Sequence, residues 1–137
     1  MTQVLELPNP FEGEGGVIRL LEPDGCDRDA LIGRILGGHY DKPFVIEEGG
    51  SRALYFSRAL TQSAMRLSDP CALEFNYTRQ MMACLLFAPR PRHILMLGFG
   101  GGSLAKFCHR HLPSARVTAV EIDPHVLAFR EQFLVPP

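Results

Sequence analysis

The sequence has few of the features that mark membrane, secreted or nucleic-acid-binding chains. It contains no tryptophan, and its 14 basic and 15 acidic side chains leave a net charge of -1 over 137 residues. Such a balance offers no electrostatic attraction to nucleic acid or to anionic lipid. No apolar run approaches the roughly 18 residues of a membrane span, and the first residues lack a basic segment followed by an apolar one. A cytoplasmic protein with neither nucleic-acid nor membrane partners is therefore expected.

Cysteine is scarce, and histidine is scattered. The four cysteines are widely spaced and include no Cys-x-x-Cys pair: Cys26, Cys71, Cys84 and Cys108. This spacing argues against a zinc knuckle and against a disulfide framework. His109 and His111 are two residues apart on a predicted helix, so they project to different faces. We expect reduced thiols and no metal site.

Residues 1–70 are predicted to form an N-terminal arm followed by a β-hairpin domain. Residues 1–40 are rich in glycine, proline and acidic groups, with short apolar pieces, and fit an edge hairpin, a short helix or a partly ordered arm. The strongest hairpin signal is Gly49-Gly50, which lies between the β-rich runs Pro43–Glu47 and Ala53–Phe56. A further strand is expected at Ser63–Leu67.

Residues 71–137 are predicted to form a helix and then the start of a second, incomplete domain. The helix spans Cys71–Ala88, where apolar side chains recur at helical spacing, and prolines after Ala88 end it. The chain then alternates strand, helix, strand and helix, over Ile94–Leu97, Ser103–Leu112, Arg116–Ile122 and the residues after Asp123-Pro124. The uninterrupted apolar strand Ile94–Leu97 is typical of a parallel sheet buried on both faces.

A glycine turn joins the first of these strands to its helix. Gly98, Gly100, Gly101 and Gly102 stand where the backbone must turn sharply and allow a ligand to approach closely, and Ser103 is expected to cap the helix. The amides at the start of that helix offer a positive end to an anionic group. Glu121 ends the next strand, where an acidic side chain can accept hydrogen bonds from ribose hydroxyls. This order predicts a nucleoside site; NAD ranks second, because Ser103 stands where a dinucleotide motif has its third glycine or alanine.

These motifs, over residues ~43–134, resemble the spermidine synthase-like family, whose fold is that of class I S-adenosylmethionine-dependent methyltransferases. The matching positions are Gln62, Glu74-Phe75-Asn76-Tyr77, Ile94-Leu95-Met96-Leu97-Gly98 and Val120-Glu121-Ile122-Asp123. The resemblance implies a cofactor site for S-adenosylmethionine or decarboxylated S-adenosylmethionine, with Glu121 on the ribose and the glycine turn facing the amino-acid-like part. By the same resemblance, Gln62 and Tyr77 border the cofactor and amine pockets, and Ile122 lies beside Glu121 in the acidic motif.

Three departures from the family pattern bear on activity. The family carries an aspartate at the position of Gly101, and a His-Glu pair at Thr78-Arg79. Both changes remove negative charge that would complement a polyamine. The family also places its catalytic acidic loop after the fourth strand of the sheet, and this sequence contains only two such strands. We therefore expect a fragment of a longer protein, or a chain completed by a partner, whose own catalytic activity is uncertain.

The sequence as a whole predicts an α/β fold: a small N-terminal β-hairpin region followed by the first half, β-α-β-α, of a Rossmann-like methyltransferase fold. The expected function is that of a spermidine synthase-like transferase in polyamine biosynthesis. A methyltransferase and a non-catalytic interaction module are the alternatives. The expected partners are a small-molecule amine or other nucleophile and further copies of the chain in a homo-oligomer.

Overall fold

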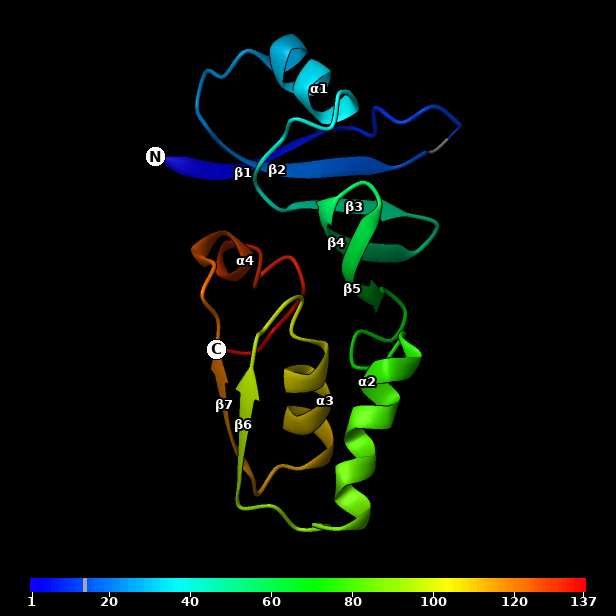
Figure 1. Cartoon of the computed structure of the whole chain (residues 1–137), viewed down its shortest axis with the longest axis vertical. Coiled ribbons are helices and arrows are strands. Elements are labelled where there is room, and N and C mark those ends of the chain that lie inside the picture. The colour runs from blue at the N-terminus through cyan, green and yellow to red at the C-terminus, as the bar shows by residue number, and fades with distance from the viewer. Residues whose placement is uncertain (14) are drawn as a thin grey trace.

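A computed structural model describes residues 1–13 and 15–137 of the chain. It is a mixed α/β structure, as predicted. A five-stranded antiparallel sheet lies at one end of the molecule, and a two-stranded parallel sheet with its helices lies at the other (Figure 1). Helix α4 lies between the two sheets.

The antiparallel sheet follows chain order, β1-β2-β3-β4-β5. Its strands are β1 (Thr2–Pro8), β2 (Val17–Pro23), β3 (Phe44–Glu48), β4 (Ser51–Ser57) and β5 (Leu60–Arg66). The predicted hairpin at Gly49-Gly50 is confirmed, since both glycines have positive φ and join β3 to β4. The strand expected at Ser63–Leu67 is also present, and begins three residues earlier.

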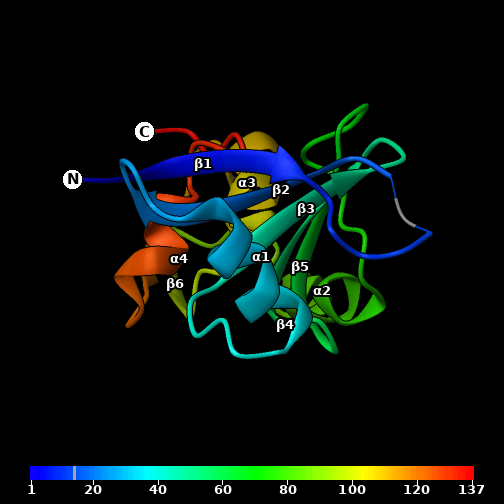
Figure 2. The same ribbon diagram turned by 90° about the horizontal axis from the view of Figure 1, so that it is seen from above.

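Helix α1 (Arg28–Leu36) resolves the options left open for the first forty residues: they form the β1–β2 pair and this helix. Asp27 begins it by accepting hydrogen bonds from the amides of Asp29 and Ala30. Leu31 and Ile35 are buried against apolar side chains of the sheet. Figure 2, which looks down on the sheet, shows α1 lying across it.

The helix expected over Cys71–Ala88 is shorter than predicted. Helix α2 covers Asn76–Met81 and passes into a 3-10 helix, η1 (Met82–Leu86). The residues before α2 are held as turns, and the Arg79 guanidinium donates to the carbonyl of Leu73 at 2.7 Å. The apolar stripe that suggested a longer helix is largely exposed among the described residues; Tyr77, for example, is 50% exposed.

The parallel sheet pairs β6 (His93–Leu97) with β7 (Arg116–Val120), and α3 (Ser103–His111) connects them. Burial of β6 on both faces was a wrong prediction: Ile94 and Met96 are partly buried, whereas Leu97 is 83% exposed. The connecting helices of a parallel sheet cover its faces, and α3 is the single helix between β6 and β7, so one face of this sheet is left open. The prediction of Ser103 as a helix cap is also wrong. Gly102 takes that position, with a φ of 69° that glycine adopts without strain.

Helix α4 (Pro124–Ala128) begins as predicted, with Asp123 accepting a hydrogen bond from the amide of His125. It ends after five residues instead of running almost to the C-terminus. Phe129 and Phe133 are nevertheless fully buried, packed against Leu54 and Met65 of the antiparallel sheet. The C-terminal segment, residues 129–137, thus links the two halves of the molecule.

None of the helices within residues 1–13 and 15–137 is long and apolar enough to cross a membrane. In the same residues, no three histidine, cysteine or acidic side chains gather as a metal site would require. All four cysteines are free thiols.

Candidate functional site

The glycine turn, Gly98–Gly102, follows β6 and leads into α3. Gly98, Gly100 and Gly102 have φ angles of 89°, 56° and 69°, a left-handed region that disfavours side chains. The amide of Gly98 donates to the carbonyl of Val120 at 2.8 Å, so the turn is tied to the end of β7. The turn therefore exposes backbone next to the residue that follows β7.

That residue is Glu121, and its carboxylate faces the turn. Its Oε2 atom accepts from the amides of Phe99 at 2.8 Å and Gly100 at 3.5 Å, and its Oε1 atom accepts from the amide of Asp123 at 3.0 Å. Burial by itself would raise the pKa of Glu121, but these amides and that of Ile122 together lower the pKa below its usual value. The side chain is an anion at neutral pH, held against the turn.

The turn and Glu121 share one cavity of about 270 Å³, close to the lower end of the ~300–1,000 Å³ typical of ligand pockets. Five of the eight predicted site residues line it: Gln62, Tyr77, Gly98, Gly100 and Glu121. They come from β5, α2, the turn and the residue that follows β7. Among the described residues that line the cavity, Glu121 is the single charged side chain; the other walls are neutral or apolar.

Three predicted site residues lie outside this cavity. The amide of Gly101 donates to the Ser63 hydroxyl at 3.0 Å, so this glycine faces β5. A Cβ atom on Gly102 would lie 2.5 Å from Val135 Cγ2, so Gly102 faces the C-terminal segment. Ile122 is 97% exposed. Gly101 and Gly102 thus pack against other parts of the chain, β5 and the C-terminal segment, and not against the cavity.

Three polar residues that line the cavity were absent from the predicted site: Ser63, Thr78 and Ser103, the last of which was predicted only as a helix cap. Ser63 is buried in β5, lines the cavity and holds the amide of Gly101. Thr78 lines it from α2, next to Tyr77, whose hydroxyl donates to the carbonyl of Gln62 at 3.3 Å. A buried serine within a strand was the available signal, because buried hydroxyls are normally hydrogen-bonded.

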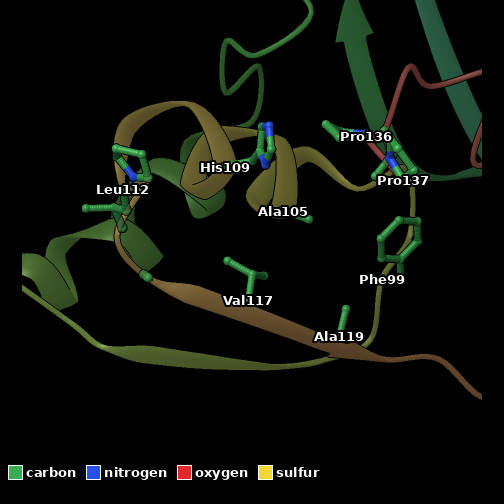
Figure 3. Close-up of a pocket in the computed structure, with 11 residues that line it drawn as sticks. Phe99, Ala105, His109, Leu112, Val117, Ala119, Pro136 and Pro137 are labelled. Carbon is green, nitrogen blue, oxygen red and sulfur yellow. The ribbon is translucent and has the colours of Figure 1, made fainter.

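A second cavity of about 400 Å³ lies on the other side of Phe99, between α3, β7 and the C-terminal segment (Figure 3). Its walls include Val117, Ala119, His109 and Pro136. It shares Phe99 and Ala105 with the first cavity, and no predicted site residue lines it. The first cavity is therefore the candidate site.

Comparisons with known proteins point to two kinds of transferase. The chain is 43% identical over 93 residues to the polyamine aminopropyltransferase of Chromobacterium violaceum, an alignment that covers 68% of this chain and 36% of that protein. A polyamine aminopropyltransferase of Neisseria meningitidis matches equally well, 43% over 94 residues. The eEF1A lysine and N-terminal methyltransferase homolog of Drosophila melanogaster is 52% identical over 42 residues, 31% of this chain and 6% of that protein. No protein-family model matches the chain.

Among solved structures, a probable spermidine synthase from Corynebacterium glutamicum has a similar fold. The TM-score is 0.50 with 22% sequence identity, and the match covers all of this chain and 41% of the other. The chain thus spans about a third of the length of the curated aminopropyltransferases that it matches. The sequence and fold comparisons agree on the resemblance that the motifs predicted.

Proposed function

We propose that this chain, a member of the spermidine synthase-like family, binds S-adenosylmethionine or its decarboxylated form in the cavity beside Glu121. The observation that carries this proposal is the convergence of the glycine turn and the Glu121 carboxylate on one cavity. Because β6 and β7, the strands that precede the turn and Glu121, are parallel and adjacent, their carboxyl ends lie at the same edge of the sheet. This edge is where open α/β sheets hold their ligands.

The residues of the cavity fit a nucleoside. The Oε2 atom of Glu121 accepts two backbone amides, whereas Oε1 accepts that of Asp123 and so has an acceptor direction left for a ribose hydroxyl. Gly98 and Gly100 leave no side chain between the backbone and the ligand. The first turn of α3, whose residues Ser103 to Ala105 line the cavity, presents its positive end to it.

The proposed reaction is aminopropyl transfer, as the names of the longest-matching relatives suggest. A bound sulfonium would supply an electrophilic carbon: an acceptor nitrogen would form the new C–N bond and lose a proton to solvent, while the C–S bond breaks and leaves a neutral thioether. The part proposed for this chain is to hold the nucleoside and to orient that carbon toward an acceptor; Gln62, Tyr77 and Thr78, which line the cavity, are the residues proposed to face the acceptor.

Methyl transfer is the second candidate, and two observations favour it. A polyamine acceptor calls for several carboxylates, yet Glu121 is the single acid among the described residues of the cavity. At Gly101, a Cβ atom would lie 2.9 Å from the Cβ atom of Ser63 and 3.1 Å from the Phe133 ring. The acidic side chain that the family pattern carries at this position therefore has no room here.

Isothermal titration calorimetry with both cofactors tests this function. We expect binding of at least one of them, with tighter binding of the decarboxylated form if the transferred group is aminopropyl and of the intact form if it is methyl. Saturation at about 100 times the dissociation constant should then stabilise the fold by about 2.7 kcal/mol. His109→Ala, in the second cavity, is the matched control and should leave affinity unchanged. Failure of both cofactors to bind would contradict the proposal and favour an interaction module.

A further inference from the structure

The back of the glycine turn, opposite the candidate cavity, is covered by the C-terminal segment. We propose that Lys106 and Arg52 are positioning residues that hold this segment as a brace, and that the brace sets the turn amides that face Glu121. The part of this inference that concerns ligand affinity rests on the proposed function. The part that concerns the turn itself does not.

Two cations from different halves of the molecule hold consecutive carbonyls of the segment. Lys106, on α3, donates from Nζ to the carbonyl of Phe133 at 2.8 Å. Arg52, on β4, donates from Nη1 to the carbonyl of Gln132, and its Nε atom donates to Glu47 at 2.7 Å. The segment is therefore attached both to the antiparallel sheet and to the helix that follows the turn.

Lys106 is an unusual residue for a purely structural position. Lys106 carries a charged amino group although the residue is only 2% exposed. Burial lowers the pKa of Lys106 to about 8, while nearby Cys71 opposes this shift and Arg52 adds to it. Burial of a charged amino group without an ion-pair partner costs free energy, which an apolar side chain of similar volume would not incur. What an apolar side chain cannot replace is the hydrogen bond to the Phe133 carbonyl.

The segment touches the turn directly. The Phe133 ring lies 3.1 Å from the position that a Cβ atom on Gly101 would take. Val135 Cγ2 lies 2.5 Å from the position that a Cβ atom on Gly102 would take. A side chain at Gly101 would collide with Ser63 of β5 as well as with Phe133, and one at Gly102 would collide with Val135. The position of the segment therefore limits where the turn can lie.

Phe99 contacts the surroundings of the segment with its side chain and the candidate site with its backbone amide. Its ring lies within 3.1 Å of the position of a Cβ atom on Gly102, and it lines the second cavity together with Val135 and Pro136 (Figure 3). The amide of the same residue donates to Glu121 in the candidate cavity. A displaced segment would thus move the amide that orients the carboxylate.

Lys106→Met tests the brace, with Arg110→Met on the exposed side of the same helix as its matched control. Amide signals of Phe99 and Gly100 are recorded by two-dimensional NMR without ligand, and affinity for S-adenosylmethionine is measured by calorimetry. We expect Lys106→Met to fold, to shift both amide signals and to weaken binding about tenfold. Arg110→Met should change neither. Unchanged amide signals and unchanged affinity in folded Lys106→Met would overturn the inference.

Val135→Ala provides a second route if Lys106→Met does not fold, because Val135 lies outside the buried core. It should shift the same two amides, and the double variant should lose no more affinity than Lys106→Met alone, since both changes release one brace. Additive losses, or unshifted amides in Val135→Ala, would count against the brace. If amides shift although the unchanged chain binds no S-adenosylmethionine, the brace stands and the proposed function fails.

Discussion

Glu121→Ala is expected to weaken cofactor binding roughly 10- to 100-fold. The change removes the acceptor proposed for the ribose, and a hydrogen bond to a charged group contributes about 1.5–3 kcal/mol. It also leaves the amides of Phe99 and Asp123 without their present acceptor. Calorimetric titration of the variant with whichever cofactor the unchanged chain prefers measures this loss.

Glu121→Gln separates the charge of Glu121 from its shape. The glutamine side chain keeps one acceptor oxygen, so the cofactor affinity of this variant should fall between those of the unchanged chain and Glu121→Ala.

Because the pKa of Glu121 is lowered in the folded chain, its carboxylate stabilises the fold above the ordinary glutamate pKa. That contribution is lost as the pH falls through the folded pKa, and Glu121→Gln should lack this acid-dependent part. An unchanged dissociation constant in Glu121→Ala would remove Glu121 from the site.

Gly102→Ala is expected to cause a large loss of stability, about 3 kcal/mol or more. A side chain there must adopt a φ of 69° and also displace Val135, which lies 2.5 Å from the position of the new Cβ atom. The left-handed conformation costs roughly 1–2 kcal/mol and overpacking a further ~1–3 kcal/mol. Urea unfolding followed by circular dichroism gives the difference in free energy of unfolding.

Gly38→Ala is the matched control for this substitution. Gly38 has a φ of 71°, nearly that of Gly102, but nothing lies within 4 Å of its Cβ position. Its cost should therefore be the conformational strain alone, about 1 kcal/mol once the lower entropy of the unfolded chain is counted. Equal losses in the two variants would show that the C-terminal segment does not press on the turn.

The parts of the fold that sequence reasoning anticipated are those controlled by neighbouring residues. Gly49-Gly50 specifies the hairpin because two successive positive φ angles favour glycine, and Asp123 with Pro124 specifies the start of α4. The lengths of α2 and α4 were not predictable in this way. Phe133 is buried from a turn instead of a helix, and helical spacing alone cannot distinguish the two.

Sequence reasoning likewise anticipated one part of the candidate site and missed another. The approach of Glu121 to the turn follows from two adjacent parallel strands, and the order of motifs contains that information. The surroundings of Gly101 do not follow, because Ser63 lies 38 residues away in sequence and Phe133 reaches the turn only through the packing of the C-terminal segment. Contacts of this range depend on the whole fold.

The function proposed for this chain requires that a nucleoside cofactor occupies the cavity between the glycine turn and Glu121. Chemical-shift mapping of the ¹⁵N-labelled chain during titration with S-adenosylmethionine and with its decarboxylated form measures this occupancy. The predicted result is that saturable shifts appear at Gln62, Tyr77, Gly98 and Gly100, and that Val117 and Ala119 of the second cavity stay unshifted. Shifts centred on Val117 and Ala119, or no saturable shift with either compound, would contradict it.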